Sequence, residues 1–281
     1  MAGGAVTRFA PSPTGLLHLG HAYAALVAAG LAGPGRFLLR IEDIDRDRCR
    51  PEYEAAIHED LAWLGLRWPV PVMRQSDRLA EYRKALGRLA PLSYPCRCRR
   101  GDIRAALSAP QEGAVPAGPD GLVYPGTCRS RNLSDAEPGD VIRLDMARAF
   151  DALGIDRIGF RDRAIMPDHD HVLTRDQVLE RIGDVILSRR GMGTSYHLAV
   201  VVDDAAQGVT LVTRGSDLFD ATYIHVLLQK LLRLPTPAYH HHRLIRDDTG
   251  RRLAKRDDAR AIRHYRKDGA SPQDIRRMLG L

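Results

Sequence analysis

The chain has 281 residues, a formal net charge of +7 and 44% hydrophobic residues, enough for the core of one large domain or of two smaller ones. This charge favours a polyanionic partner, either a nucleic acid or an anionic membrane surface. The chain is not expected to span a membrane, because no apolar run approaches roughly 20 residues. Its four cysteines, without a signal-peptide pattern at the start, predict a protein of the reducing cytoplasm.

The first part of the chain is expected to form a β-α-β unit. Two apolar segments, residues 6–9 and 37–41, have the composition of buried parallel strands. The Ala- and Leu-rich segment between them has helical spacing from His18 onwards. Two further segments, 52–66 and 79–89, have the periodicity of helices.

Beyond this unit the composition changes. Residues 108–126 are rich in Pro, Gly and Ala, which predicts a long irregular loop or an inserted region. The expected strands of the remaining chain are 141–144, 157–160, 185–187, 197–202 and 209–213. The expected helices are 218–233, 259–265 and 272–279.

This order of elements predicts an α/β fold in which two halves of one main domain are separated by an insertion of around a hundred residues. The expected boundaries are 1–92 for the first half, 93–190 for the insertion, 191–240 for the second half and 241–281 for a C-terminal segment with short helices.

The most informative stretch lies between the first strand and the first helix. Residues 8–15 read RFAPSPTG, and His18-Leu-Gly20-His21 follows them. A helix N-terminus presents N–H groups and a partial positive charge, so this junction suits a phosphate. Gly20 lets a flat ring lie against the backbone, and two imidazoles can donate to phosphate oxygens. The alternative is a proline-rich loop before a core helix, with surface histidines.

This stretch resembles the ATP-binding HIGH region of class I aminoacyl-tRNA synthetases, and its RFAPSPTG form resembles the glutamate-specific branch. Further motifs extend the resemblance over nearly the whole chain: RIEDID at 40–45, YHLAVVVDD at 196–204, VTRGSDL at 212–218 and RLAKR at 252–256. The resemblance implies a Rossmann-like parallel sheet, split by an inserted connective region that meets the tRNA acceptor or stem and carries a zinc site.

The resemblance also implies an L-glutamate site at the ends of the parallel strands. Glutamate brings one ammonium and two carboxylates, so arginines suit its carboxylates and Glu42 suits its ammonium. The implied glutamate-binding residues are Arg8, Phe9, Ala10, Pro11, Ser12, Glu42, Tyr196 and Arg214. Taken from the residues alone, the run 40–45 could instead be a solvated charged face, and Asp43 and Asp45 are expected to be structural.

For ATP, the resemblance implies binding by His18, Gly20, His21 and Lys255, with Mg²⁺ accompanying the triphosphate. His18, His21 and Lys255 are the implied catalytic residues, stabilising the phosphates while the α-carboxylate of glutamate attacks the α-phosphorus. RLAKR resembles the KMSKS loop with Arg and Ala replacing the usual first Lys and the Ser, and we expect activity to survive. Taken alone, this motif also fits an ordinary basic surface turn.

A second constellation consists of Cys96, Cys98, Tyr124 and Cys128. By spacing it is a weak metal signal, because Cys-x-Cys is tighter than the usual pattern and tyrosine is a rare zinc ligand. The alternative is two buried thiols and an exposed one. The resemblance implies that all four residues hold one structural Zn²⁺, which would stabilise an insertion without a core of its own. Cys49 is expected to be a bystander.

Two histidine-rich stretches raise the question of a metal site. Residues 240–242 are consecutive histidines, which a strand would point to opposite faces. We expect them at the surface, with His240 the one that could lie near ATP. Residues 168–171, with the sequence DHDH, could bind a metal weakly, but we expect them to form a solvated loop.

The best match within the family is a short paralogue of the glutamyl-tRNA synthetases. It implies ATP-dependent activation of L-glutamate without tRNA, and transfer to the queuosine base in the anticodon of tRNA(Asp). Only about 25 residues follow Lys255, so an anticodon-binding domain is expected to be missing. The alternatives are a truncated glutamyl- or glutaminyl-tRNA synthetase that charges the tRNA 3′ end, and a non-catalytic nucleotide- or RNA-binding relative. We expect a cytoplasmic monomer.

Overall fold

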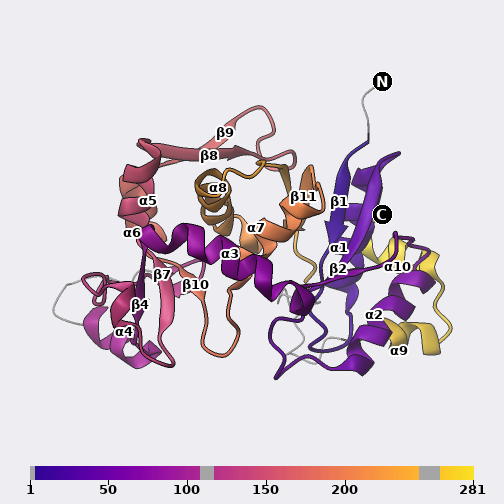
Figure 1. The fold of residues 1–281 in the computed structure, drawn as a ribbon. Helices are drawn as coiled ribbons and strands as arrows, with labels where there is room; N and C mark the ends of the chain where they lie inside the picture. Colours follow the sequence, from indigo (N-terminus) through magenta and orange to yellow (C-terminus); the bar gives the residue numbers. More distant parts are fainter. Residues whose placement is uncertain (1–3, 108–116, 247–259) are drawn as a thin grey trace.

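The computed structural model describes residues 4–107, 117–246 and 260–281. Lys255 and the rest of the RLAKR motif lie outside the described residues. One end of the molecule holds the N-terminal β-α-β unit with the C-terminal helices, and the other end holds most of residues 93–188 (Figure 1). Helix α3 (Leu79–Leu89) runs along one side between the two ends.

The N-terminal unit is a parallel sheet in the order β1-β2-β3. Its elements are β1 (Val6–Phe9), α1 (Leu19–Ala32), β2 (Arg36–Ile41), α2 (Pro51–Trp63) and β3 (Met73–Arg74). The predicted strands and helices of this part are confirmed. The apolar run of β2 is buried from its second residue on, which is typical of a strand covered on both faces.

Residues 93–188 contribute separate antiparallel pairings. The sheet β10-β7-β4 consists of β4 (Ser93–Cys96), β7 (Val141–Leu144) and β10 (Ile186–Ser188). The other elements of this region are α4 (Arg100–Leu107), β5 (Ala117–Gly118), β6 (Gly121–Leu122), α5 (Met146–Leu153), β8 (Arg157–Arg161), β9 (Asp170–Thr174) and α6 (Arg175–Arg181).

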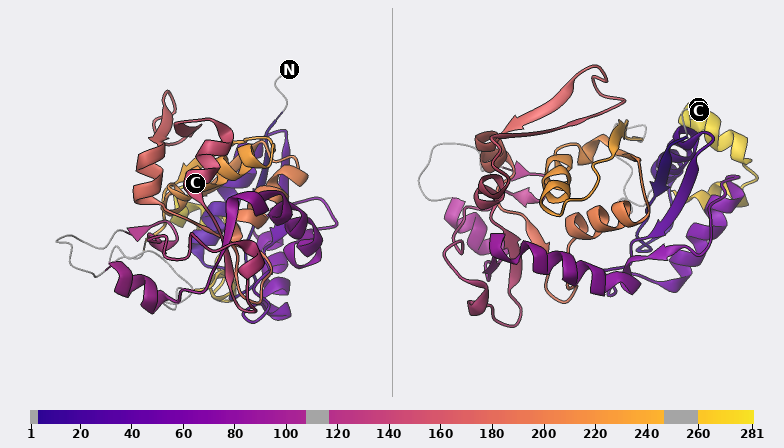
Figure 2. Two further views of the ribbon diagram at one scale, coloured as in Figure 1. Left: turned by 60° about the vertical axis from the view of Figure 1, so that its left-hand side comes forward. Right: turned by 45° about the horizontal axis from the view of Figure 1, so that its top comes forward.

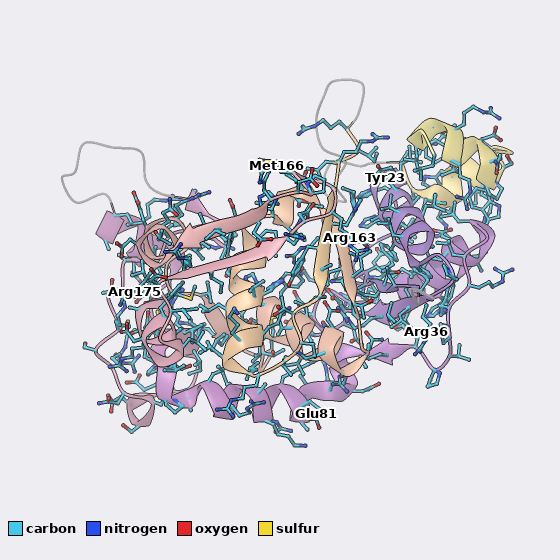
Figure 3. The ribbon with its side chains drawn as sticks, turned by 90° about the horizontal axis from the view of Figure 1, so that it is seen from above. Tyr23, Arg36, Glu81, Arg163, Met166 and Arg175 are labelled. Atoms are coloured by element: carbon cyan, nitrogen blue, oxygen red, sulfur yellow. The ribbon has the colours of Figure 1, made fainter. Side chains whose placement is uncertain are left out.

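Strands β8 and β9 form a ribbon that runs from the end of the molecule holding α5 and α6 to about its middle (Figure 1). It extends from Arg175 at the start of α6 to Met166 in its outer connection (Figure 3), and both views in Figure 2 show it projecting. The loop predicted at residues 168–171 is therefore partly wrong, because β9 begins at Asp170 and pairs with Arg161.

The second α/β half places a new parallel pair beside β1. Its elements are α7 (Tyr196–Ala206), β11 (Leu211–Gly215), α8 (Ala221–Leu231) and β12 (Ala238–His242). β11 pairs in parallel with β12, and the N–H of Thr210 donates to the carbonyl of Val6 at 2.9 Å. The chain ends with α9 (Ile262–Lys267) and α10 (Pro272–Leu279), which pack by Ile262, Ile275 and Leu279 into the core of the N-terminal unit.

The strand predicted at residues 197–202 is wrong, because this segment lies within helix α7. Ser195 caps the helix by accepting a hydrogen bond from the N–H of Leu198 at 3.3 Å. The run is buried on almost every side, so its continuous apolar sequence is compatible with a core helix as well as with a core strand. β-branched residues lower helix propensity by only a few tenths of a kcal/mol, which burial easily outweighs.

Candidate active site

A cavity of about 360 Å³ lies at the carboxyl ends of β1, β2 and β11. The predicted residues that line it are Arg8, Phe9, Ala10, His18, Gly20, His21, Glu42, Tyr196 and Arg214. Pro11 and Ser12 are not among the lining residues, and Lys255 lies outside the described residues. The cavity therefore joins groups that are far apart in the sequence.

The two histidines form the start of helix α1. His18 is the N-cap, and its Nδ1 accepts from the N–H of Gly20 at 3.1 Å, while the Nδ1 of His21 accepts from the N–H of His18 at 3.2 Å. A Cβ at position 20 would approach the His18 ring to 3.0 Å, so the absence of a side chain at Gly20 leaves space for this ring. Because Nδ1 is an acceptor in each neutral imidazole, each ring carries its proton on Nε2.

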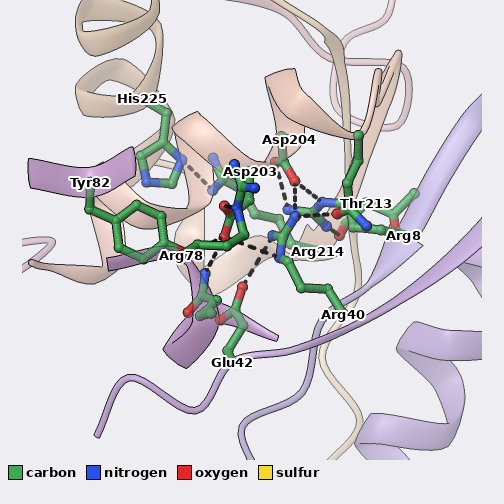
Figure 4. Close-up of polar contacts among 12 residues, drawn as sticks. Arg8, Arg40, Glu42, Arg78, Tyr82, Asp203, Asp204, Thr213, Arg214 and His225 are labelled. Carbon is green, nitrogen blue, oxygen red and sulfur yellow. Dashed lines mark hydrogen bonds and ion pairs between the residues drawn. The ribbon is translucent and has the colours of Figure 1, made fainter. Parts of the chain in front are cut away.

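Arg8 and Arg40 converge on one carboxylate of helix α7 (Figure 4). Asp204 accepts from Nε and Nη2 of Arg8 at 2.9 and 3.2 Å, and from Nη1 of Arg40 at 2.6 Å. Although burial opposes it, the two guanidiniums hold the pKa of Asp204 below its ordinary value. The two-pronged carboxylate contact expected of Arg8 is thus made to Asp204 within the protein.

Arg40 is fully buried and also holds Glu42, with Nη2 3.2 Å from Oε1. Burial raises the pKa of Glu42, and the Arg40 and Arg8 guanidiniums oppose that rise. Asp203, the neighbour of Asp204, accepts from Tyr82 Oη at 2.7 Å and from Arg78 Nε at 2.7 Å. The charged cluster therefore supports the cavity structurally. Glu42 is the acidic residue of this cluster that lines the cavity.

Arg214 has a different set of partners. It donates to His241 Nε2 at 3.1 Å, to His225 Nδ1 at 2.8 Å and to Thr222 Oγ1 at 2.5 Å. Tyr196 lies beside it at the wall, and burial raises the pKa of this phenol. These acceptors are uncharged, so the positive charge of Arg214 is available to a ligand carboxylate.

The charged run at residues 40–45 is not a solvated face. Arg40 and Asp43 are buried, and Asp43 accepts from Ser76 through both its N–H at 2.8 Å and its hydroxyl at 2.7 Å. Asp43 also pairs with Arg74 at 3.3 Å, which agrees with its expected structural role.

The surface position predicted for residues 240–242 is wrong for two of the three histidines. β12 pairs with β11 inside the fold, and His241 and His242 are buried. His242 lines the cavity and packs edge-on against Tyr23, whereas His240 is not among the lining residues. Four further lining residues, Thr213, Gly215, Asp217 and Leu218, belong to the VTRGSDL motif but were not predicted as site residues. The lining residues outside every predicted motif are Ala24, His242, Arg243, Leu244 and Ile245.

The four predicted metal ligands come together at the far end of the molecule. The sulfurs of Cys96, Cys98 and Cys128 lie within 4.8 Å of one another, and Tyr124 Oη is 3.4 Å from Cys96 Sγ and 3.5 Å from Cys98 Sγ. Sulfur ligands of tetrahedral zinc lie about 3.8 Å apart, so this donor set fits such an ion. Although burial opposes it, the hydrogen bond to Tyr124 lowers the pKa of the Cys128 thiol to about 7. Cys49 is not part of the cluster.

Known proteins match the chain over almost its whole length. Residues 5–281 match the family described as tRNA synthetases class I (E and Q), catalytic domain. The chain is 58% identical to a Glutamyl-Q tRNA(Asp) synthetase of Rhodobacter capsulatus, over 98% of this chain and 100% of that protein. It is 43% identical to one of Nocardia farcinica, over 98% of this chain and 84% of that protein.

Among solved structures, a glutamate tRNA ligase from Elizabethkingia meningosepticum in complex with its amino acid superimposes with a TM-score of 0.71 at 28% identity. The match covers 95% of this chain and 53% of that one, so the chain spans about half the length of that ligase. In the described part of the chain, the helices are too short or too polar to cross a membrane.

Proposed function

The chain belongs to the class I tRNA synthetases of the E and Q type, and on that basis we propose that it activates L-glutamate with ATP and transfers the glutamyl group to the queuosine base in the anticodon of tRNA(Asp). The observation that supports activation most directly is the single cavity shared by a histidine-capped helix start and a charged amino-acid pocket. The acceptor base is supported by the Rhodobacter and Nocardia relatives, which carry that base and tRNA in their names.

The amino-acid end of the cavity suits glutamate. Arg214 offers an uncompensated guanidinium to a carboxylate, and Tyr196 beside it can donate its phenol. Glu42 offers a carboxylate to the ammonium. Arg8 can serve a second ligand carboxylate only with the N–H groups that Asp204 and the Thr213 carbonyl do not occupy. Phe9 and Ala10 line the pocket. We assign Pro11 and Ser12, which follow them in the sequence, to the loop beside it.

The nucleotide end suits the phosphates of ATP. The Nδ1 atoms of His18 and His21 accept backbone N–H groups, which places the ring protons on Nε2, and both rings line the cavity. Gly20 leaves room at the helix start, where the helix dipole favours an anion. We assign Lys255 to the triphosphate from the resemblance of RLAKR alone.

In the proposed reaction, an α-carboxylate oxygen of glutamate bonds to the α-phosphorus, and the bond from this phosphorus to the bridging oxygen breaks. Pyrophosphate leaves with that electron pair, and the chain contributes positioning and hydrogen-bond donors rather than a nucleophile. Mg²⁺, when bound with ATP, would neutralise part of the phosphate charge. A hydroxyl oxygen of the queuosine cyclopentene-diol then bonds to the acyl carbon and gives its proton to water. The bond from that carbon to the phosphate oxygen breaks, and AMP leaves with the electron pair.

We also propose that Cys96, Cys98, Tyr124 and Cys128 hold one structural Zn²⁺. The three sulfurs and the phenol oxygen have suitable mutual distances, and the N–H of Cys128 donates to Tyr124 Oη at 2.8 Å, which orients that oxygen. The ion would tie the inserted region, residues 93–190, into one unit between catalytic halves at 1–92 and 191–240. We propose a monomer that acts in the cytoplasm, with RNA as its polyanionic partner.

Activation is tested by glutamate-dependent exchange of labelled pyrophosphate into ATP without tRNA. We expect exchange with L-glutamate and a large loss in an Arg214→Gln variant. Arg157→Gln is the control, because Arg157 is an exposed arginine on β8 whose one ion pair within the described residues is to its neighbour Asp156. Exchange that requires tRNA would contradict the proposal.

Transfer is tested with labelled glutamate and two preparations of tRNA(Asp), with and without queuosine. We expect label only on the queuosine-containing tRNA. Label at the 3′ end of either preparation would favour the alternative, a truncated glutamyl- or glutaminyl-tRNA synthetase.

A further inference from the structure

Two buried hydrogen-bond series lead away from Arg214. In the first, Arg214 Nη1 is 2.8 Å from His225 Nδ1, His225 Nε2 is 3.0 Å from His197 Nδ1, and His197 Nε2 is 3.0 Å from Asp120 Oδ1. In the second, Arg214 Nε is 3.1 Å from His241 Nε2, and His241 Nδ1 is 2.5 Å from Asp162 Oδ2. Each series starts at a guanidinium and ends at a carboxylate.

The chemistry of the two ends fixes the direction of every bond in the first series. A guanidinium only donates and an ionised carboxylate only accepts. His225 therefore accepts at Nδ1 and donates from Nε2, and His197 does the same. Both imidazoles are neutral in this arrangement, since a second proton on either ring would place two donors against each other.

Burial supports the neutral state of His225. His197 and His225 are buried, and burial together with the Arg214 charge keeps the pKa of His225 well below its ordinary value. The first series ends nearer the surface, because the Asp120 side chain is 31% exposed. Although burial opposes it, the hydrogen bond from His197 keeps the pKa of Asp120 below its ordinary value, so the end of the series is ionised.

We propose that His225 and His197 are positioning residues that orient Arg214 for the glutamate carboxylate, and that Asp120, outside the amino-acid cavity, sets this orientation through them. The inference rests on the proposed function, since it assigns to Arg214 the carboxylate of the amino-acid substrate. Asp120 acts by fixing the tautomers of the two rings, so that each presents its bare nitrogen toward Arg214. It is not a lining residue and is not assigned a contact with substrate.

The location of Asp120 gives this series a consequence for the inserted region. Asp120 lies in the turn between β5 (Ala117–Gly118) and β6 (Gly121–Leu122), and the same segment continues to Tyr124 of the cysteine cluster. Amino-acid affinity thus depends on a segment of the insertion that approaches helix α7 from outside the catalytic halves.

The test uses two substitutions of a half-exposed residue, chosen to spare the core. Asp120→Asn keeps an oxygen acceptor for His197 but loses the charge, and Asp120→Ala loses both. We expect KM for glutamate to rise about two- to threefold in the first variant and about five- to tenfold in the second, with KM for ATP and the melting temperature unchanged. The control is Glu137→Gln, another carboxylate of the insertion, 64% exposed and paired with Arg97.

Two results would overturn the proposal. One is a glutamate KM in Asp120→Ala equal to that of wild type. The other is an equal rise in the KM values for glutamate and ATP, which would indicate a general structural effect.

A second measurement separates this inference from the proposed function. Nitrogen-15 NMR of histidine-labelled protein distinguishes the N–H from the bare nitrogen of each ring, with His225→Gln used to assign its signals. We expect His197 and His225 as Nε2–H tautomers in wild type and a redistribution in Asp120→Ala, whichever acid the enzyme activates. Unchanged ring signals in that variant would refute the series, and absent glutamate-dependent exchange in wild type would refute only the function.

Discussion

Replacing Asp204 by Asn should strongly destabilise the protein and weaken the proposed amino-acid pocket. Asp204 is buried and joins Arg8, which lines the cavity, to Arg40, which does not. If Asn keeps its oxygen at the Oδ1 position, the contacts to Arg8 Nε and Arg40 Nη1 survive. The amide nitrogen then faces Arg8 Nη2, where Oδ2 accepts a bond of 3.2 Å, so two donors meet.

The magnitude follows from the charge balance of this buried group. Asp204 neutralises guanidiniums whose side chains are only 6% and 0% exposed, and its own side chain is 7% exposed. Removing one partner of such a group costs about 3–5 kcal/mol, because the remaining charge stays buried. For a chain of this size that corresponds to a fall in melting temperature of about 10 °C.

Thermal and urea unfolding measure this effect directly. The matched control is Asp151→Asn, which removes an ion pair to Arg175. The pair is 3.2 Å long, and the Asp151 side chain is 68% exposed. Exposed pairs contribute up to about 1 kcal/mol, so the control should melt within about 3 °C of wild type. If Asp204→Asn shifts the melting temperature no more than Asp151→Asn does, the buried-charge reasoning is refuted.

Three further outcomes are expected. The pKa of Asp60, a buried carboxyl of α2, is raised from 3.8 to about 6, chiefly by burial. Between pH 3.8 and about 6, the folded chain therefore holds more protons than the unfolded chain. This group should lower the free energy of unfolding by about 3 kcal/mol as pH rises through the window; urea titrations of wild type and Asp60→Asn should diverge accordingly, and parallel curves would contradict this. Removing bound zinc with a chelator should lower the melting temperature by about 5 °C or more in wild type and not in Cys98→Ala, and an unchanged wild type would count against the metal. Lys255→Ala should reduce pyrophosphate exchange by about 100-fold or more without changing the melting temperature, and wild-type exchange would remove Lys255 from the mechanism.

Local patterns predicted the elements whose signals lie within a few residues of one another. The helix at 79–89 and the helix at 272–279 are observed at the predicted bounds. The start of α1 next to His18 was also predicted, because the loop, the histidine and the glycine are adjacent in the sequence. The class I α/β fold followed from several motifs in order, and the match to residues 5–281 confirms it.

The buried charge cluster could not be predicted in the same way. Asp204 meets Arg40 across 164 positions and Arg8 across 196 positions of the sequence, so no short window contains the pair. One signal was present: two adjacent carboxylates, Asp203 and Asp204, directly follow an apolar run. A buried carboxylate requires a cationic partner, and the charged run at residues 40–45 was the place to look for it.

The histidines of β12 illustrate a second limit. Alternation along a strand indicated that neighbours face opposite sides, but not which side is the core. His241 is buried because Asp162, 79 positions earlier, accepts from both its ring and its backbone N–H. The polarity of the imidazole suggested that His241 would be exposed. The prediction failed because the Asp162 carboxylate, distant in the sequence, satisfies this ring inside the fold.

In the proposed glutamate pocket, the two arginines differ in whether their charge is already matched by a carboxylate of the protein. Arg8 is matched by Asp204, so it adds little net charge and mainly contributes shape and N–H groups. Arg214 is matched by neutral acceptors, so its charge faces the cavity until a ligand carboxylate arrives. Had Asp120 or Asp162 contacted Arg214 directly, the internal pair would compete with the substrate. Imidazoles placed between them give orientation without that competition.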